Sequence, residues 1–226
     1  MYYSVVIPAY NARETLADAL ASVMAQTAAP SEIIVVDDGS TDNSGQIAAG
    51  FGPLVKIIKQ DNQGCGAATS TGMRAAASDI IATLDADDIW LAEKMERQLA
   101  ELASGPNISL VFCRQRQFHH GRPDDGRGEE RAGLNRSSMV CRRAVFETIG
   151  DIIDPPGNRG DLVDWLARAR EAEFVFAELP EVLALRRIIR GSLSFGRDPA
   201  RDRGYLLVAH RAMMRRRLSA SEPDAS

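Results

Sequence analysis

The sequence predicts an α/β domain built around a mostly parallel, twisted β-sheet with helices on both faces. Short apolar runs recur along the first hundred residues, and each is continuous rather than alternating, which is typical of strands buried on both faces. Segments with apolar residues at helical spacing separate these runs, so crossover helices are expected to join consecutive strands. With 226 residues, the chain has the length of a single domain with a substantial core.

Four strand candidates lie in the first hundred residues, and a fifth follows them. They are the runs 3–7, 32–36, 54–58, 80–84 and 108–112. The first helix is predicted to open in a capping box of Asn11 and Glu14 and to bury one apolar face. A later helix carries a similar face at helical spacing. The apolar positions of these two helices are Leu16, Leu20, Val23 and Met24 in the first, and Leu91, Met95, Leu99 and Leu102 in the later one.

Composition and charge are those of a soluble globular protein. Apolar residues make up 45% and charged residues 26% of the chain, and the net charge of -4 argues against nucleic acid as a general partner. No apolar run is long enough to span a bilayer, and the chain opens on a strand candidate rather than a leader. Cys65, Cys113 and Cys141 are odd in number and lack metal-ligand spacing. We therefore expect reduced thiols in a cytoplasmic protein.

Polar residues gather where the first three strand candidates end. In a parallel sheet these ends share one edge, and ligands bind beyond it. Tyr10 can stack on a planar base, and the carboxylate of Asp38 can accept a hydrogen bond from the imide nitrogen of that base. Gly64 permits a tight turn and a close approach of the backbone to a ligand. The alternatives are that Tyr10 only packs and that Asp42 only caps the following helix.

An acidic cluster, Asp85-Ala86-Asp87-Asp88, follows the fourth strand candidate. Three carboxylates within four residues repel one another unless a cation or a group of donors lies among them. Asp85 and Asp87 are spaced so that both can offer oxygens to one divalent ion, whose other ligands are then waters and phosphate oxygens. The alternative is a helix start with Asp88 as its N-cap.

These motifs resemble, in order and spacing, those of the family 2 glycosyltransferases with the GT-A fold. The similar segments are 5–11, 35–42, 60–72 and 84–90. The resemblance implies a single GT-A domain that catalyses inverting transfer from a nucleotide sugar, interpreted here as UDP-linked, with a bound Mn²⁺ or Mg²⁺ ion. It implies that Pro8, Tyr10 and Asp38 hold the nucleoside. Asp85 and Asp87 match the metal-binding Asp-x-Asp, with Asp87 preferred as the direct ligand and Asp85 nearer the ribose.

The resemblance also assigns residues in the second half of the chain. Asp161 matches the general base of the family, and Asp164 is the second candidate for that role. The alternative for Asp161 is a plain helix N-cap. Ile189 stands where related chains frequently carry a metal-proximal His, and Arg190 is expected to neutralise the diphosphate instead. The complete set of predicted donor-binding residues is Pro8, Tyr10, Asn11, Asp38, Gly64, Asp85 and Arg190.

The chain is predicted to divide into two halves of one domain. Residues 1–104 form the nucleotide-sugar-binding half, 105–218 form the acceptor-binding and catalytic half, and 219–226 form a disordered tail. The acceptor is expected to be a polysaccharide, a lipid carrier or a peptide. A helix over 202–218 ends in basic residues, which either touch an anionic membrane surface peripherally or form a solvated helix end.

Departures from the family pattern keep a second function open. Thr69 and Gly160 replace an Arg and a Glu that the family often carries, and Ile189 replaces the His. These changes favour, as the alternative, a catalytically degenerate nucleotide-sugar-binding or assembly protein. A nucleotidyltransferase is less favoured because the first loop lacks a glycine- and lysine-rich motif. His119 and His120 lie in a polar, glycine-rich segment that we expect to be a mobile loop without metal.

Overall fold

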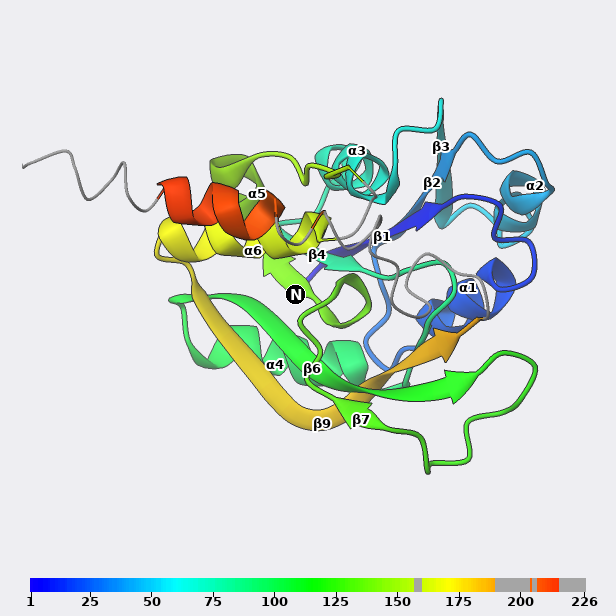
Figure 1. Ribbon diagram of the computed structural model, residues 1–226. Coiled ribbons are helices and arrows are strands. Elements are labelled where there is room, and N and C mark those ends of the chain that lie inside the picture. The colour runs from blue at the N-terminus through cyan, green and yellow to red at the C-terminus, as the bar shows by residue number, and fades with distance from the viewer. Residues whose placement is uncertain (157–159, 190–203, 205–206, 216–226) are drawn as a thin grey trace, which may run out of the picture.

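The fold is organised around a mixed β-sheet, in a computed structural model that describes residues 1–156, 160–189, 204 and 207–215 (Figure 1). The first four strands are neighbours in the order β3-β2-β1-β4, and all of them are parallel. Their bounds are Tyr3–Ala9 for β1, Glu32–Asp38 for β2, Val55–Gln60 for β3 and Ile80–Thr83 for β4. Because β1, β2 and β4 are buried along their whole length, continuous apolar runs predicted them correctly.

The second half of the chain extends this sheet with mixed strand directions. β8 is antiparallel to both β4 and β6, whereas β6 and β9 run parallel and side by side along one edge of the molecule (Figure 1). The short strand β5 is antiparallel to β9, and β7 is antiparallel to β6. The bounds are Ile89–Trp90 for β5, Ile108–His119 for β6, Glu130–Arg131 for β7, Val140–Arg142 for β8 and Val175–Ile188 for β9. The predicted α/β class is confirmed, and the parallel arrangement is confined to β1–β4 and the β6–β9 pair.

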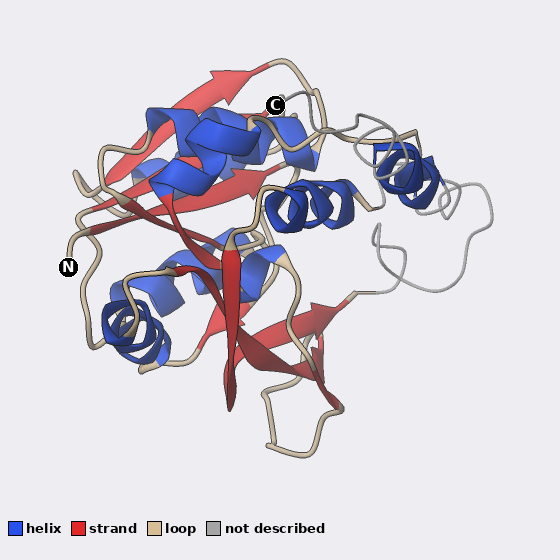
Figure 2. Cartoon of the chain, turned by 90° about the vertical axis from the view of Figure 1, so that its left-hand side faces the viewer, coloured by secondary structure: helices blue, strands red, loops and turns tan. Residues whose placement is uncertain are grey.

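Helices cover both faces of the sheet (Figure 2). The bounds are Leu16–Met24 for α1, Ser44–Ala49 for α2, Cys65–Ala75 for α3, Lys94–Ser104 for α4, Arg143–Ile149 for α5 and Asp161–Glu171 for α6, with a 3-10 turn, η1, at Arg136–Ser138. Residues 207–215 are also helical, and the rest of the predicted 202–218 helix, apart from helical residue 204, lies outside the described residues, as does the predicted tail. Among the helices that the structure describes, none has the length and apolar character needed to cross a bilayer.

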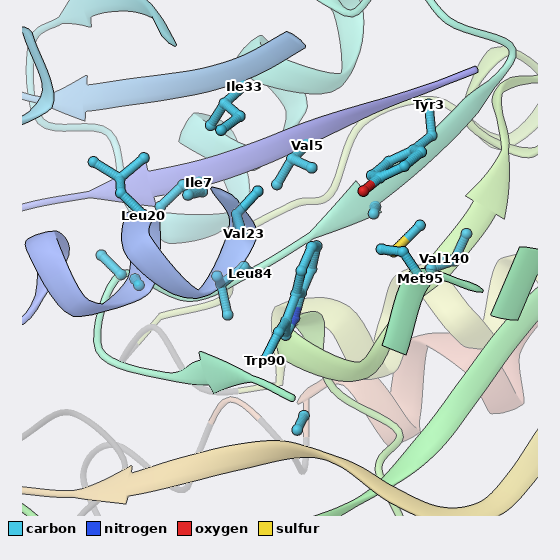
Figure 3. Close-up of a cluster of buried hydrophobic side chains, with 14 of the residues drawn as sticks. Tyr3, Val5, Ile7, Leu20, Val23, Ile33, Leu84, Trp90, Met95 and Val140 are labelled. Atoms are coloured by element: carbon cyan, nitrogen blue, oxygen red, sulfur yellow. The ribbon is translucent and has the colours of Figure 1, made fainter. Parts of the chain in front are cut away.

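Two apolar clusters hold these layers together, one on each face of the sheet. Successive residues of β1 point to opposite faces, so Val5 packs with α1 and α4 in one cluster, drawn in Figure 3, and Val6 packs with α3, α5 and α6 in the other. Helix α3 lies so close to β1 that a Cβ atom at Gly72 would collide with the Val6 side chain. The core thereby fixes the strand ends, where the predicted site residues lie.

Two predicted helix starts are wrong. Helix α1 begins at Leu16 without a capping box, because Asn11 adopts a left-handed φ of 49° and its side chain accepts hydrogen bonds from Thr41. Helix α4 begins at Lys94, so the predicted member Leu91 lies outside it. Asp88 is not its N-cap, because the strand β5 intervenes.

The glycine-rich segment predicted as a mobile loop forms a hairpin. Strand β7 pairs with β6, and Arg116 binds the carboxylate of Asp124 through two hydrogen bonds of 3.0 and 2.5 Å. Gly128 packs against the carbonyl group of Gln117 at a position where no Cβ atom fits. The structure shows ion pairing and close backbone packing in this segment, and the mobility that its polarity and glycine content suggested stays a prediction.

Candidate active site

A cleft of about 580 Å³ opens beyond the carboxyl ends of β1 and β4, beside the end of β9. Chain segments from both halves of the sequence meet there. The lining residues are Pro8, Tyr10, Asn11, Ala12, Thr15, Cys65, Asp85, Ala86, Asp87, Asp88, Asn135, Arg136, Arg186, Arg187 and Ile189. The rule that ligands bind at the carboxyl edge of parallel strands therefore locates the cleft correctly.

Five of the predicted site residues meet in this cleft, namely Pro8, Tyr10, Asn11, Asp85 and Asp87. Tyr10 is 53% exposed as a residue, which leaves it open to a stacking partner. The side chain of Asn11 is occupied differently. Its amide oxygen accepts a hydrogen bond of 2.8 Å from the backbone N–H of Thr41, which ties the β1 loop to the β2 loop.

Asp38 lies next to the cleft but is not among its lining residues. The residue is 3% exposed, and its carboxylate accepts three hydrogen bonds, from Gln60 Nε2 at 2.7 Å, from Gln63 N at 3.0 Å and from Gly64 N at 2.9 Å. These contacts fix the loop that leads into α3. The structure therefore gives Asp38 a loop-organising role, and its predicted contact with a nucleobase stays a prediction. Asp42 accepts from the backbone N–H groups of Ser44 at 2.9 Å and of Arg13 at 3.1 Å. The N-cap residue of α2 is Asn43, so the alternative that Asp42 only caps this helix is wrong.

Gly64 has a second function that the sequence did not suggest. The carboxylate of Asp154 accepts hydrogen bonds from the backbone N–H groups of Gly66 at 3.0 Å and Ala67 at 2.8 Å, at the first turn of α3. A Cβ atom at either Gly64 or Gly66 would lie 2.8 Å from that carboxylate. Gly64 also has a φ of 100°, which favours glycine. Both glycines are therefore required for the docking of Asp154.

The acidic cluster Asp85-Ala86-Asp87-Asp88, called the acidic segment from this point, is held by groups from two distant parts of the chain. The buried Asp88 carboxylate accepts from Ser137 Oγ at 2.5 Å and from the backbone N–H of Arg187 at 2.9 Å. Burial, followed by the negative charge of Asp85, raises the pKa of Asp87 to about 6, and the charges of Arg186 and Arg187 oppose this rise. Burial also raises the pKa of Asp88 well above its usual range, together with the charges of its two acidic neighbours.

Arg136 links this segment to the start of α6. Its Nε donates to Asp85 Oδ1 at 2.8 Å, and a terminal nitrogen donates to Asp161 Oδ2 at 2.6 Å. The Arg136 side chain is only 11% exposed. The N-cap residue of α6 is Gly160, with a φ of 96°, and Asp161 is the first helical residue. The plain N-cap alternative for Asp161 is therefore wrong.

Neither candidate base is among the residues that line the cleft. Asp161 is joined to the cleft through Arg136, whereas the second candidate, Asp164, has other partners. Its oxygens accept from Arg168 Nε at 3.1 Å and from a terminal nitrogen of Arg215 at 2.9 Å. Arg215 belongs to the helical segment 207–215, so Asp164 ties that segment to α6. Arg190 lies outside the described residues, and Ile189 lines the cleft as an apolar neighbour.

Arg187 is the most connected site residue that sequence reasoning gave no role. Besides the bond from its backbone to Asp88, its guanidinium donates to the backbone carbonyl of Asp87 and to Asp18, each at 2.8 Å. The same group lies 4.8 Å above the ring of Phe118. Arg187 thereby ties the acidic segment to α1 and β6, and its guanidinium is already bound to groups of the protein.

The donor set at the cleft suits a magnesium or manganese ion. Asp85 and Asp87 offer hard carboxylate oxygens, and the raised pKa of Asp87 reflects its burial and then the nearby negative charge of Asp85. Within the part of the chain that the structure describes, no three acidic, histidine or cysteine side chains are arranged to surround an ion. An ion held here would therefore need phosphate or water ligands as well, which is the usual mode for Mg²⁺.

The sheet and its carboxyl-edge cleft define a GT-A glycosyltransferase fold. The structure of Staphylococcus aureus TarS residues 1–349 in complex with UDP superposes with a TM-score of 0.71 and 17% identity, covering 95% of this chain and 65% of TarS. The mannosyltransferase PcManGT from Pyrobaculum calidifontis, in complex with GDP-Man and Mn²⁺, gives a TM-score of 0.67 and 18% identity over 98% of this chain and 76% of that one. At these identities the likeness establishes the fold.

The chain belongs to glycosyl transferase family 2, whose family model matches residues 4–155. It is 35% identical over 111 residues to the Escherichia coli UDP-Glc:alpha-D-GlcNAc-diphosphoundecaprenol beta-1,3-glucosyltransferase WfgD, covering 48% of this chain and 44% of that protein. It is 45% identical over 101 residues to an uncharacterised glycosyltransferase of a Nostoc strain, covering 43% of this chain and 31% of the relative. The chain thus spans less than half the length of these two relatives. The predicted resemblance is confirmed.

Proposed function

We propose that this chain carries the donor-binding and catalytic part of an inverting glycosyltransferase that uses a nucleoside-diphosphate sugar. The observation that carries this proposal is the Arg136 bridge, because Arg136 lines the cleft and joins the carboxylate of Asp85, which also lines it, to that of the nearly buried Asp161. The donor is proposed to be UDP-linked, supported by the UDP complex of TarS and by the UDP-Glc donor of WfgD. PcManGT binds GDP-Man, so a guanosine donor is the competing choice.

Residues 1–104 would bind the nucleotide. Pro8 and Tyr10 line the cleft where a base would stack, and Asp85 would reach the ribose. Asp38 and Gly64 shape the loop that borders this position. Asp87 and Asp85 would hold a divalent cation, which offsets the charge that develops on the departing diphosphate.

Asp161 would act as the general base. The acceptor oxygen attacks the anomeric carbon, the bond from that carbon to the diphosphate oxygen breaks, and the bonding pair leaves with the nucleoside diphosphate. The acceptor proton passes to Asp161 Oδ1, because Oδ2 is already bound to Arg136. In-line attack on the face opposite the leaving group inverts the anomeric configuration. Arg136 holds the carboxylate in one orientation throughout.

The acceptor would contact residues 105–218. WfgD takes a diphosphoundecaprenol-linked sugar as its acceptor, which supports a lipid carrier over a polysaccharide or a peptide. Contact of the 207–215 helix with an anionic membrane surface fits such a carrier. The free thiols Cys65, Cys113 and Cys141 support action in the cytoplasm.

The decisive experiment incubates purified protein and Mn²⁺ with a panel of UDP- and GDP-sugars and measures nucleoside-diphosphate release with and without a lipid-diphosphate acceptor analogue. Release that depends on the acceptor, with inverted product stereochemistry by NMR, is the expected result. Nucleotide binding without turnover of any donor would favour the degenerate binding protein instead. Ile189 in the cleft is the observation that supports this second candidate, because it supplies no metal ligand.

A further inference from the structure

Three guanidinium groups line the described part of the cleft, and two of them are committed to the protein itself. They belong to Arg136, Arg186 and Arg187. Arg136 is bound to Asp85 at 2.8 Å and to Asp161 at 2.6 Å. Arg187 is bound to Asp18 at 2.8 Å and to the carbonyl of Asp87, and it stacks over Phe118. Neither group can turn to a ligand without leaving a carboxylate unpaired.

Arg186 differs from both. Among the described residues, no carboxylate lies within ion-pair distance of its guanidinium. The side chain is half-buried at the end of β9. Strand β9 is antiparallel to β5, with Ile89 opposite Leu185, so one step forward along β9 and one step back from β5 bring Arg186 beside Asp88, the end of the acidic segment. Arg186 is near enough to Asp87 that its charge opposes the rise in the pKa of that carboxyl group.

A diphosphate would meet an electrostatic problem in this cleft. Asp85, Asp87 and Asp88 all line it, and negative charge on these carboxylates repels a polyanion. The apolar Ile189 offers no compensation. A guanidinium presents a planar set of donors that suits two phosphate oxygens at once and stays charged at all relevant pH values.

We propose that Arg186 binds the diphosphate of the nucleotide donor. Its guanidinium supplies a positive charge next to the carboxylates of the acidic segment. This inference rests on the proposed function, since it assumes a nucleoside-diphosphate ligand. The diphosphate would then lie next to the carboxyl end of β9. Binding through Arg186 would let nucleoside diphosphates bind in part without a divalent ion.

The test is a calorimetric titration of uridine, UMP and UDP, and of guanosine, GMP and GDP, in Mn²⁺ and separately in EDTA. The variants are Arg186→Gln, Arg186→Lys and the control Arg97→Gln, which removes the same charge from the exposed face of α4. Arg186→Gln should weaken diphosphate binding about ten- to a hundredfold, the effect of losing a charge-assisted hydrogen bond. The nucleosides should bind unchanged, and the loss should be larger in EDTA. Arg186→Lys should retain part of the affinity, and Arg97→Gln should behave as the wild type.

Two results would overturn this assignment alone. In one, the wild type binds a diphosphate and Arg186→Gln binds it equally well. In the other, Arg186→Gln weakens nucleoside binding as much as diphosphate binding, which would mean that Arg186 acts on the shape of the cleft. If the wild type binds neither UDP nor GDP in either buffer, the proposed function fails, and the assignment of Arg186 fails with it.

Discussion

Arg136 and Asp161 are 25 residues apart in the sequence, yet a guanidinium nitrogen of Arg136 lies 2.6 Å from Asp161 Oδ2. The two side chains are 11% and 9% exposed. A nearly buried pair of this kind gives limited net stability, but removing one partner leaves the other charge without compensation. The free energy of unfolding should therefore fall when either residue is replaced alone, and fall less than additively when both are replaced together.

The Arg136→Met variant should lose about 3 kcal/mol of unfolding free energy at pH 7, because it leaves Asp161 buried without its cation. The double variant Arg136→Met with Asp161→Asn should recover a large part of that loss. Urea unfolding of the four proteins of the cycle measures both effects. Additive losses in the double variant would contradict a direct Arg136–Asp161 interaction.

Asp161→Asn should leave donor binding intact and reduce transfer about 10²- to 10⁴-fold, the range for losing a general base. Asp164→Asn is the matched comparison. It should affect turnover much less, because Arg168 and Arg215 occupy its carboxylate away from the cleft. Steady-state kinetics on both variants, with calorimetry for donor affinity, separates the two carboxylates. A larger loss of turnover in the Asp164 variant would reverse the assignment.

Asp87→Asn should weaken nucleotide binding in the presence of Mn²⁺. In the presence of a chelator, it should also remove a pH dependence of the free energy of unfolding. The pKa of Asp87 is raised to about 6 in the folded protein from 3.8, so the folded state disfavours its charged form. The resulting loss of stability is absent below pH 4, grows as the pH rises to 6 and is complete above that. In EDTA, Asp87→Asn should therefore be more stable than the wild type by about 1–3 kcal/mol at pH 7 and equal to it at pH 4. Equal stability at both pH values would contradict the raised pKa.

Lys94 is fully buried, and its ammonium lies 4.0 Å above the ring of Trp90. Burial lowers its pKa from 10.5 to about 8. Since the unfolded chain keeps the proton up to higher pH, wild-type stability should rise between pH 8 and 10.5 relative to Lys94→Met. At pH 7 the Lys94→Met variant should be the more stable of the two, by on the order of 1–3 kcal/mol. Thermal melts of both proteins across this pH range give the comparison, and parallel curves would show that Lys94 titrates normally.

The sequence predicted the strands β1–β4 well because an apolar run marks each of them. A continuous apolar run can be recognised without knowing which strands lie beside it. The carboxyl ends of β1 and β4 then located the cleft. Strand β9 was missed for the opposite reason. It contains Pro180 and several charged residues, and its pairing with β6 is interrupted by a register shift that takes up Pro180 and Glu181.

The candidate site was predicted in part for a related reason. Tyr10, Asp85 and Asp87 follow strands directly, so local sequence indicates their position. Arg136 and Asp154 have no such signal, because their partners lie 51 and 88 residues away, at Asp85 and Gly66. Only the folded chain shows that these residues belong to the site or to its support.

The pairing of β5 with β9 has a consequence for synthesis on the ribosome. Residues 1–83 contain the strands β1–β4, which can pair with one another once they have emerged. The acidic segment is different, because Asp88 receives its backbone donor from Arg187, 99 residues later. A nascent chain that stops before β9 would therefore hold its clustered carboxylates on an unpaired loop. The acidic segment becomes organised late in translation, and truncation at residue 174 should leave it without this backbone donor.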